Sequence, residues 1–297
     1  MTAVETRTLT KHFRDVTAID DVDLTLEPGR IHGLLGRNGA GKTTLMKLLT
    51  GQIFASAGSM RVLGADPVEN PQVLAQTCFI QESQKYPDGF RPLDVLRIAG
   101  GLYPAWDQQL ARELVADFRL PEKRVIKKLS RGQLSAVGIV IGLASRAPLT
   151  FFDEPYLGLD AVARRLFYDR LLADFTEHPR TVILSTHHID EVANLLEHVV
   201  LLDEGRVAID EEAEALQAAA IEVSGRAAEV TDFAQGAEVL HHQEIGSLAT
   251  VTVHAAGGLA DRARAAGLQV SPVSLQNYIV HRTTTATATP AATAAAR

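Results

Sequence analysis

The stretch "GRNGAGKTT", residues 36–44, decides the fold of this chain of 297 residues. It contains the pattern G-x-x-x-x-G-K-[ST], in which a glycine-rich loop turns its backbone N–H groups toward a phosphate chain. The apolar "RIHGLLG" before the loop predicts a short buried strand, and "TLMKLLTGQI" after it has the spacing of a helix. We therefore expect a strand, a loop and a helix whose positive N-terminal end faces a bound phosphate.

The residue types of this loop fit a nucleoside triphosphate. Lys42 is expected to bridge the β- and γ-phosphates, and the Thr43 hydroxyl is expected to coordinate Mg²⁺. A glycine-rich turn without a ligand is the structural alternative, but it leaves the flanking strand and helix unexplained. The predicted nucleotide-binding residues of the loop are Gly36, Asn38, Gly39, Ala40, Gly41, Lys42, Thr43 and Thr44.

An acidic pair ends a second apolar strand, "LTFFDEP" at residues 149–155. Asp153 and Glu154 are expected at the carboxyl edge of the sheet, where ligands of such folds bind. One of these carboxylates can orient Mg²⁺ through water, while its neighbour faces the attacking water and accepts a proton. The structural alternative is an acidic strand end that caps the next helix, and the phosphate loop upstream argues against it.

The rest of the chain predicts an α/β P-loop NTPase fold. Two antiparallel strands are expected between Thr6 and Leu26, and a helical subdomain at about 83–145. "PLTFFDEP" and "RTVILSTHH" are each followed by a helical pattern, which is typical of a mostly parallel sheet, and "VVLLDEGRVAID" predicts a hairpin. The predicted domains are a cassette at 1–215, a small C-terminal α+β unit at 216–282 and a disordered tail at 283–297.

Composition narrows the choice of partners. The chain has 29 basic and 36 acidic residues and a net charge of −7, so no nucleic-acid partner is expected. The single cysteine, Cys78, excludes an internal disulfide and is expected to be buried. The N-terminus lacks the apolar core of a signal peptide, and no apolar run approaches the ~18 residues of a membrane span. These features predict a cytosolic chain.

The stretch "LSRGQ", residues 129–133, closely resembles the "LSGGQ" signature of ATP-binding cassette (ABC) proteins, with Arg131 in place of one glycine. The resemblance covers about the first 210 residues and implies a RecA-like sheet, ATP and Mg²⁺ as ligands, and a dimer. It also implies that Ser130, Gly132 and Gln133 contact the γ-phosphate of a nucleotide held by the opposite subunit. A hydroxyl and free N–H groups at a helix start can form such an anion site, although a plain N-cap is the structural alternative.

Four further positions follow from this resemblance. Gln81, in "FIQESQKYP", resembles the Q-loop glutamine that reaches Mg²⁺ and the attacking water, and His187, in "STHH", resembles the switch histidine. Asp160, in "LGLD", resembles the D-loop aspartate that couples the two sites of the dimer. Phe13 stands where the family places an aromatic ring against adenine. Tyr156 departs from the threonine common at its position.

The resemblance thus implies the ATP-hydrolysing subunit of an ABC transporter. We expect Glu154, His187 and Gln81 to be catalytic and Thr43, Gln81 and Asp153 to organise Mg²⁺. The expected partners are integral-membrane permease subunits and a second nucleotide-binding subunit, in a homo- or heterodimer on the inner face of the cell membrane.

The short C-terminal unit favours export of a drug, antibiotic, peptide or other hydrophobic compound, because it resembles that of bacterial exporters. A soluble ABC ATPase that acts on ribosomes or DNA is the alternative. Members of that kind usually carry paired cassettes or long coiled-coil insertions, and this chain shows neither. A regulatory subunit with weak hydrolysis is a third possibility, and the intact Glu154 and His187 argue against it.

Overall fold

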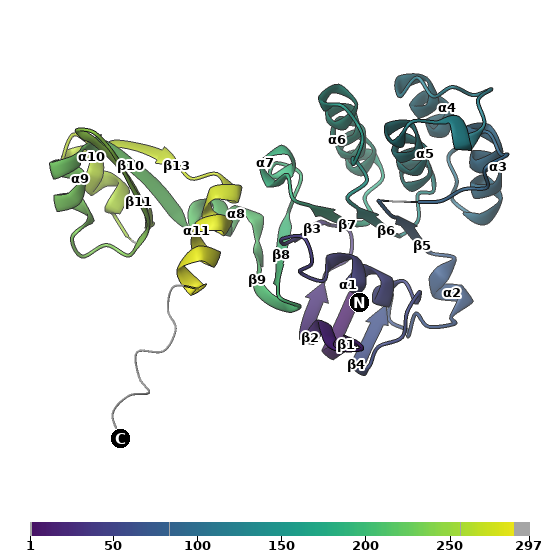
Figure 1. Cartoon of the computed structure of the whole chain (residues 1–297), viewed down its shortest axis with the longest axis horizontal. Coiled ribbons are helices and arrows are strands. Elements are labelled where there is room, and N and C mark those ends of the chain that lie inside the picture. The colour runs from purple at the N-terminus through teal and green to yellow at the C-terminus, as the bar shows by residue number, and fades with distance from the viewer. Residues whose placement is uncertain (1, 83, 256, 288–297) are drawn as a thin grey trace. The chain divides into compact units, whose positions relative to one another are not determined.

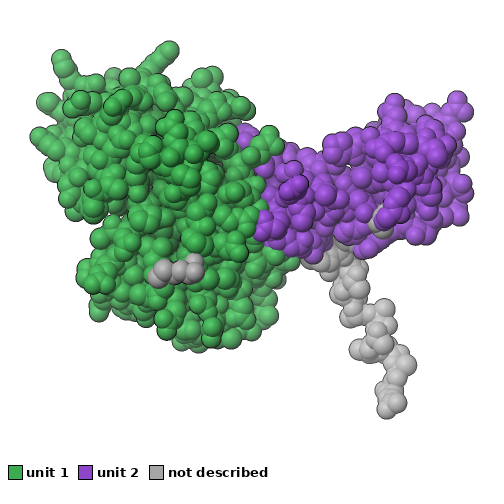
Figure 2. All heavy atoms as spheres, turned by 180° about the vertical axis from the view of Figure 1, so that it is seen from behind, with its two compact units in different colours: residues 1–187, 194–210 green, residues 188–193, 211–297 purple. Residues whose placement is uncertain are grey.

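The computed structural model describes residues 2–82, 84–255 and 257–287. The chain forms two compact units, which Figure 2 distinguishes by colour. Unit 1 consists of Met1–His187 and Asn194–Asp210, and unit 2 consists of His188–Ala193 and Glu211–Arg297. The domain boundary predicted from the sequence, at 215–216, thus lies a few residues inside unit 2.

A six-stranded sheet, mostly parallel, forms the centre of unit 1 (Figure 1). Its order is β5 (Thr77–Ile80), β6 (Leu149–Asp153), β7 (Thr181–Thr186), β3 (Ile31–Leu35), β8 (His198–Asp203) and β9 (Arg206–Glu212). Strands β3, β6 and β7 are buried at every position, as parallel strands are when both faces of a sheet are covered. Strands β8 and β9 form the predicted hairpin at one edge, and the mixed α/β fold is confirmed.

A smaller antiparallel sheet shares a hydrophobic core with the six-stranded sheet. It has the order β2 (Val16–Leu26), β1 (Val4–Phe13) and β4 (Ala57–Val62), and α2 (Pro71–Leu74) follows it in the chain. The hydrophobic core joins this sheet to α1 (Lys42–Leu49) and to the parallel strands through side chains such as Val4, Met46 and Phe151. The helix that follows the phosphate loop is therefore fixed from both sides.

The helical subdomain contains α3 (Pro92–Leu102), α4 (Gln108–Asp117), the 3₁₀ turn η1 (Ile126–Lys128) and α5 (Arg131–Ala144). From Ala136 to Ala144 every residue of α5 is buried, and the helix contacts β5 and β6. A buried ion pair between Asp174, on α6 (Ala161–Glu177), and Arg180 ties this region together. Arg146 extends the network by reaching both Asp174, at 3.2 Å, and Asp107, at 2.9 Å.

Unit 2 is an α+β fold with its own core. Its antiparallel sheet has the order β11 (Val239–Ile245), β12 (Leu248–His254), β10 (Ala220–Arg226) and β13 (Gln269–Pro272). Helices α9 (Ala227–Ala234) and α10 (Leu259–Ala265) bury Val230 and Ala263 against it. The unit also contains α7 (Ile189–Val192), α8 (Ala213–Ala218) and α11 (Leu275–Thr287). Helix α11 extends into the segment predicted to be a disordered tail, and the remainder of that segment, 288–297, lies outside the described residues.

Candidate active site

The phosphate loop connects β3 to α1 and lies close to two other backbones. Gly36 has φ = +145° and Gly41 has φ = +108°, in the region that disfavours side chains. A Cβ at Gly36 would lie 2.4 Å from the Leu202 carbonyl oxygen, and one at Gly41 would lie 2.5 Å from the Ala18 carbonyl oxygen. Glycine is therefore required at both positions by conformation and by space.

Lys42 begins α1 and is buried, with 7% of its surface exposed. Its Nζ donates to the carbonyl oxygens of Gly36, at 2.7 Å, and Arg37, at 3.3 Å. The ammonium group therefore lies inside the curve of the loop, where a phosphate chain would replace these carbonyl oxygens as its partner.

Thr43 and Asp153 meet where the phosphate loop approaches the end of β6. The Thr43 hydroxyl donates to Asp153 Oδ2 at 2.7 Å, and Ser185 donates to Asp153 Oδ1 at 2.7 Å. A hydroxyl beside a carboxylate is an oxygen donor set that fits Mg²⁺, which usually takes one or two protein ligands together with phosphates and water. Among the described residues no group of three or more His, Cys, Asp or Glu is placed to hold a metal.

Glu154 is buried and contacts two cationic or potentially cationic groups. Its Oε2 lies 2.6 Å from His187 Nδ1, and its Oε1 lies 3.6 Å from Lys42 Nζ. Its backbone has φ = +46°, which is uncommon for a residue with a side chain, and its N–H donates to Ser185 Oγ at 3.0 Å. Strained backbone held in this way directs the carboxylate toward the phosphate loop.

Tyr156 is a member of this cluster that the sequence pattern did not assign. Its side chain is 1% exposed, and its hydroxyl lies 2.8 Å from Thr186 Oγ1 and 3.4 Å from Glu154 Oε2. Burial raises the pKa of Tyr156 well above its ordinary value, so the phenol stays protonated. The only signal in the sequence was the departure from threonine at this position.

The signature residues lie at the start of α5, against the loop that precedes α6. Ser130 is the N-cap: its Oγ accepts from the Gln133 N–H at 3.2 Å, and the Gln133 side chain accepts from the Ser130 N–H at 3.0 Å. A Cβ at Gly132 would lie 2.3 Å from the Gly158 carbonyl oxygen. Asp160 caps α6 by accepting from the Ala163 N–H. These hydrogen bonds all stay within the first turns of α5 and α6, and none of them reaches the phosphate loop.

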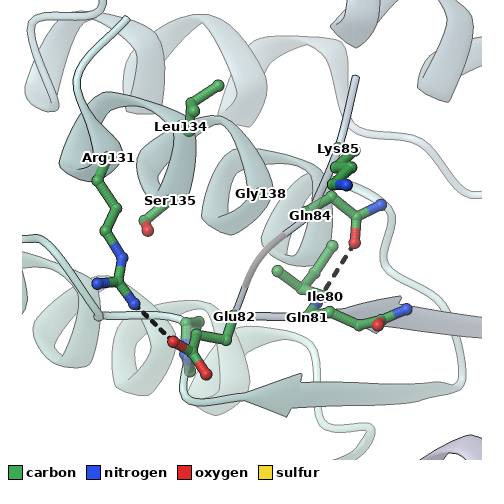
Figure 3. A pocket seen from close by; sticks show the side chains of 10 residues that line it. Ile80, Gln81, Glu82, Gln84, Lys85, Arg131, Leu134, Ser135 and Gly138 are labelled. Atoms are coloured by element: carbon green, nitrogen blue, oxygen red, sulfur yellow. Dashed lines mark hydrogen bonds and ion pairs between the residues drawn. The ribbon is translucent and has the colours of Figure 1, made fainter. Parts of the chain in front are cut away.

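A pocket of about 360 Å³ separates the segment after β5 from α5 (Figure 3). Arg131 and Glu82 approach each other across it, with Arg131 Nη2 2.5 Å from Glu82 Oε1. Gln81 lines the same pocket, but its amide donates to Gln52 Oε1 at 3.1 Å rather than to the Thr43 and Asp153 pair. The remaining described lining residues are Ile80, Gln84, Lys85, Leu134, Ser135, Gly138 and Pro155.

Phe13 lies at the end of β1 and is 46% exposed. The Lys11 ammonium lies over its ring, 4.8 Å from the ring centroid. An exposed aromatic ring beside a cation is compatible with stacking on a base.

The phosphate loop and the acidic strand end meet through Lys42 and Thr43, as they do in P-loop nucleotide hydrolases, and the fold and the site define this class. A family model described as ABC transporter matches residues 19–157. The ABC transporter ATP-binding protein YtrB of Bacillus subtilis (strain 168) is 29% identical over 201 residues, which are 68% of this chain and 69% of that protein.

Two further relatives are at least 30% identical to this chain. Nod factor export ATP-binding protein I of Cupriavidus metallidurans is 30% identical over 69% of this chain and 70% of that protein. Aliphatic sulfonates import ATP-binding protein SsuB 2 of Rhizobium johnstonii is 31% identical over 70% of this chain and 80% of that protein. The chain therefore belongs to the ATP-binding proteins of ABC transporters, and it is an ATPase of that family.

Solved structures agree on the fold. An ATP-binding subunit of an ABC transporter superposes with a TM-score of 0.65 at 24% identity, over 73% of this chain and 92% of that one. A dimeric ATP-binding cassette in a post-hydrolysis state, bound to ADP and Pi, gives a TM-score of 0.62 at 20% identity. The match covers 71% of this chain and 98% of that one. The predicted P-loop NTPase fold is thus confirmed. No helix within the described residues has the length and apolar character that crossing a membrane requires.

Proposed function

We propose that this chain hydrolyses MgATP in a dimer with a second nucleotide-binding subunit, most simply another copy of itself, and thereby drives export by a separate membrane permease. The observation that carries the catalytic part is the buried cluster in which Glu154 contacts both Lys42 and His187 beside the Thr43 and Asp153 pair. Catalysis by such a cluster depends on charges fixed in position before the substrate arrives.

Each residue of the cluster has a separate task. Lys42 stabilises the negative charge of the β- and γ-phosphates, and Thr43 with Asp153 holds Mg²⁺, which when bound offsets phosphate charge. Glu154 accepts a proton from the attacking water. His187 orients the Glu154 carboxylate through its Nδ1 and is assigned to the γ-phosphate.

The signature residues complete the site from the second subunit. Ser130, Gly132 and Gln133 lie at the start of a helix, where the helix dipole favours an anion. We assign Asp160 to the contact between the two sites, Phe13 to adenine and Gln81 to Mg²⁺ and the attacking water. Gln81 has to exchange its bond to Gln52 for that role.

The proposed direction of transport is export, and it rests on the division of the chain into a cassette and a second unit. One relative is an export protein by name and another an import protein, so the family alone leaves the direction open. The additional α+β unit after the cassette favours export of a hydrophobic compound. The permease subunits would hold the chain on the cytoplasmic side of the membrane, and the pocket beside Gln81 and Arg131 is the proposed place for a permease segment.

The test is to purify tagged Glu154→Gln protein with MgATP from detergent-solubilised native membranes and to identify the chains that accompany it. A polytopic membrane protein in equal amount supports the transporter assignment, and Lys42→Ala, which should not hold nucleotide, is the matched control. Recovery of ribosomal or DNA-bound partners alone would overturn it.

The direction of transport is tested separately. Inside-out vesicles that contain the permease and this chain should accumulate fluorescent hydrophobic drugs when ATP is added outside. ATP-dependent loss of drug from preloaded vesicles would contradict export.

A further inference from the structure

Tyr156 connects two strand ends that carry the proposed catalytic groups. It follows Asp153, Glu154 and Pro155 at the end of β6, and its hydroxyl reaches Thr186 and His187 at the end of β7. Its ring packs against Tyr168 of α6, with centroids 6.3 Å apart, which fixes the direction of the side chain. The position of this hydroxyl is therefore set by the core of unit 1 and not by solvent.

The hydroxyl contacts both members of the Glu154 and His187 pair. The backbone N–H of His187 donates to it at 3.2 Å, and His187 Nδ1 lies 3.3 Å away. Glu154 Oε2, the oxygen that faces His187, is 3.4 Å from the same hydroxyl. A phenol has one proton and two acceptor sites, so it can accept from the backbone of His187 while it donates to the carboxylate.

Two features indicate that the phenol acts as a neutral hydrogen-bonding group and not as a base. Burial raises its pKa above the ordinary value, so it does not act as a base near neutral pH. Its side chain is 1% exposed, so it is closed to solvent. What remains is a neutral group that restricts the orientations of its two neighbours.

We propose that Tyr156 is a positioning residue, whose hydroxyl holds the Glu154 carboxylate and the His187 ring in one mutual orientation for hydrolysis. This inference rests on the proposed role of Glu154 as the proton acceptor. Threonine, which the family pattern commonly has at this position, is too short to place a hydroxyl at both strand ends from the same backbone position. Tyrosine thus supplies a contact that the pattern "DEPY" alone does not reveal.

The test compares Tyr156→Phe with the wild type in steady-state ATP hydrolysis. The variant keeps the ring and removes the hydroxyl, so we expect a 10- to 100-fold lower kcat, as misplaced catalytic groups produce, and a KM for ATP within about twofold. Thr186→Val, which removes the partner at 2.8 Å, should lower kcat by a smaller factor. Tyr103→Phe is the matched control, because Tyr103 is a partly buried phenol that pairs with Cys78 away from the cluster.

A double-mutant cycle separates positioning from a purely structural role. In a His187→Ala background, Tyr156→Phe should lower kcat by less than about twofold, because the pair that it orients is already lost. An equal loss in both backgrounds, or a rise in KM with unchanged kcat, would overturn the inference. Thermal unfolding of each variant checks that the fold is retained.

The outcomes also separate this inference from the proposed role of Glu154. If Glu154→Gln hydrolyses ATP at the wild-type rate, the proposed proton acceptor is wrong and the role of Tyr156 is overturned with it. If Glu154→Gln is inactive while Tyr156→Phe has the wild-type kcat, the role of Tyr156 alone is overturned.

Discussion

The end of β6 and the start of α5 both carry proposed ATP contacts, yet they are built differently. At the end of β6 the side chains of Asp153 and Glu154 are buried, and they contact Ser185 and His187 from a distant part of the chain. At the start of α5 Ser130 bonds within its own helical turn, and the Arg131 and Glu82 side chains are 62% and 45% exposed. The first region is organised within one chain, whereas the second is a surface that a partner can complete.

Glu154→Gln tests the buried region. The amide cannot accept the proton of the attacking water, so turnover should fall by about 10²- to 10⁴-fold while ATP binding is retained. Phosphate release and nucleotide binding measure the two effects. Glu177→Gln, an exposed position at the end of α6, should leave both unchanged, and hydrolysis by Glu154→Gln at the rate of this control would remove Glu154 from its role.

Asp174→Ala extends the contrast to stability. Asp174 pairs with Arg180 at 2.5 Å, and both side chains are about 5% exposed or less. Removing the carboxylate leaves a buried guanidinium without its partner, so the free energy of unfolding should fall by about 3–5 kcal/mol. Asp169→Ala breaks an exposed ion pair on the same helix, and it should lower the free energy of unfolding by less than about 1 kcal/mol. Urea denaturation measures both, and equal effects would contradict the prediction.

Ser130→Arg tests the exposed region. The larger cation should block the approach of a second subunit without disturbing the phosphate loop, so ATP still binds but turnover falls by about tenfold or more. The wild-type rate per chain should rise with protein concentration, and that of the variant should stay low. Ser247→Arg introduces the same side chain on unit 2 and serves as the control. Wild-type kinetics from Ser130→Arg would show that the signature is not part of the site.

Glu82→Gln should have a small effect. The pair that it forms with Arg131 is exposed, and such pairs contribute about 0–1 kcal/mol. We expect the free energy of unfolding to change by less than about 1 kcal/mol and turnover by less than about threefold. A larger loss of turnover at unchanged stability would show that this pair links the two sides of the pocket.

Local motifs allowed the fold and much of the cluster to be predicted. Residues 36–44 and 149–155 each specify a strand end and its chemistry within a few positions, and the fold that they predict is confirmed. The contacts of Tyr156 could not be predicted, because its hydroxyl meets residues about 30 positions away that only the parallel sheet brings close. The side-chain direction of Gln81 depends likewise on Gln52, 29 positions earlier.

The positions of β4 and α7 could not be predicted from the sequence, because they depend on contacts with distant segments. Strand β4 has mostly exposed side chains without a clear alternation, and its pairing with β1 places it. The short helix α7 follows β7 directly, yet it belongs to unit 2, where it contacts α11. Such assignments depend on contacts between distant segments, which a pattern along the chain does not report.

Light scattering of the Glu154→Gln protein tests most directly whether two chains form one ATP site. With MgATP the protein should have twice the mass of a single chain, because the uncleaved nucleotide holds the two copies together, and without nucleotide it should have the mass of one chain. The double variant, with Glu154→Gln and Ser130→Arg in one chain, should have the mass of one chain while ATP is still bound. A single mass for ATP-bound Glu154→Gln, or a dimer that persists with Ser130→Arg, would contradict the shared site.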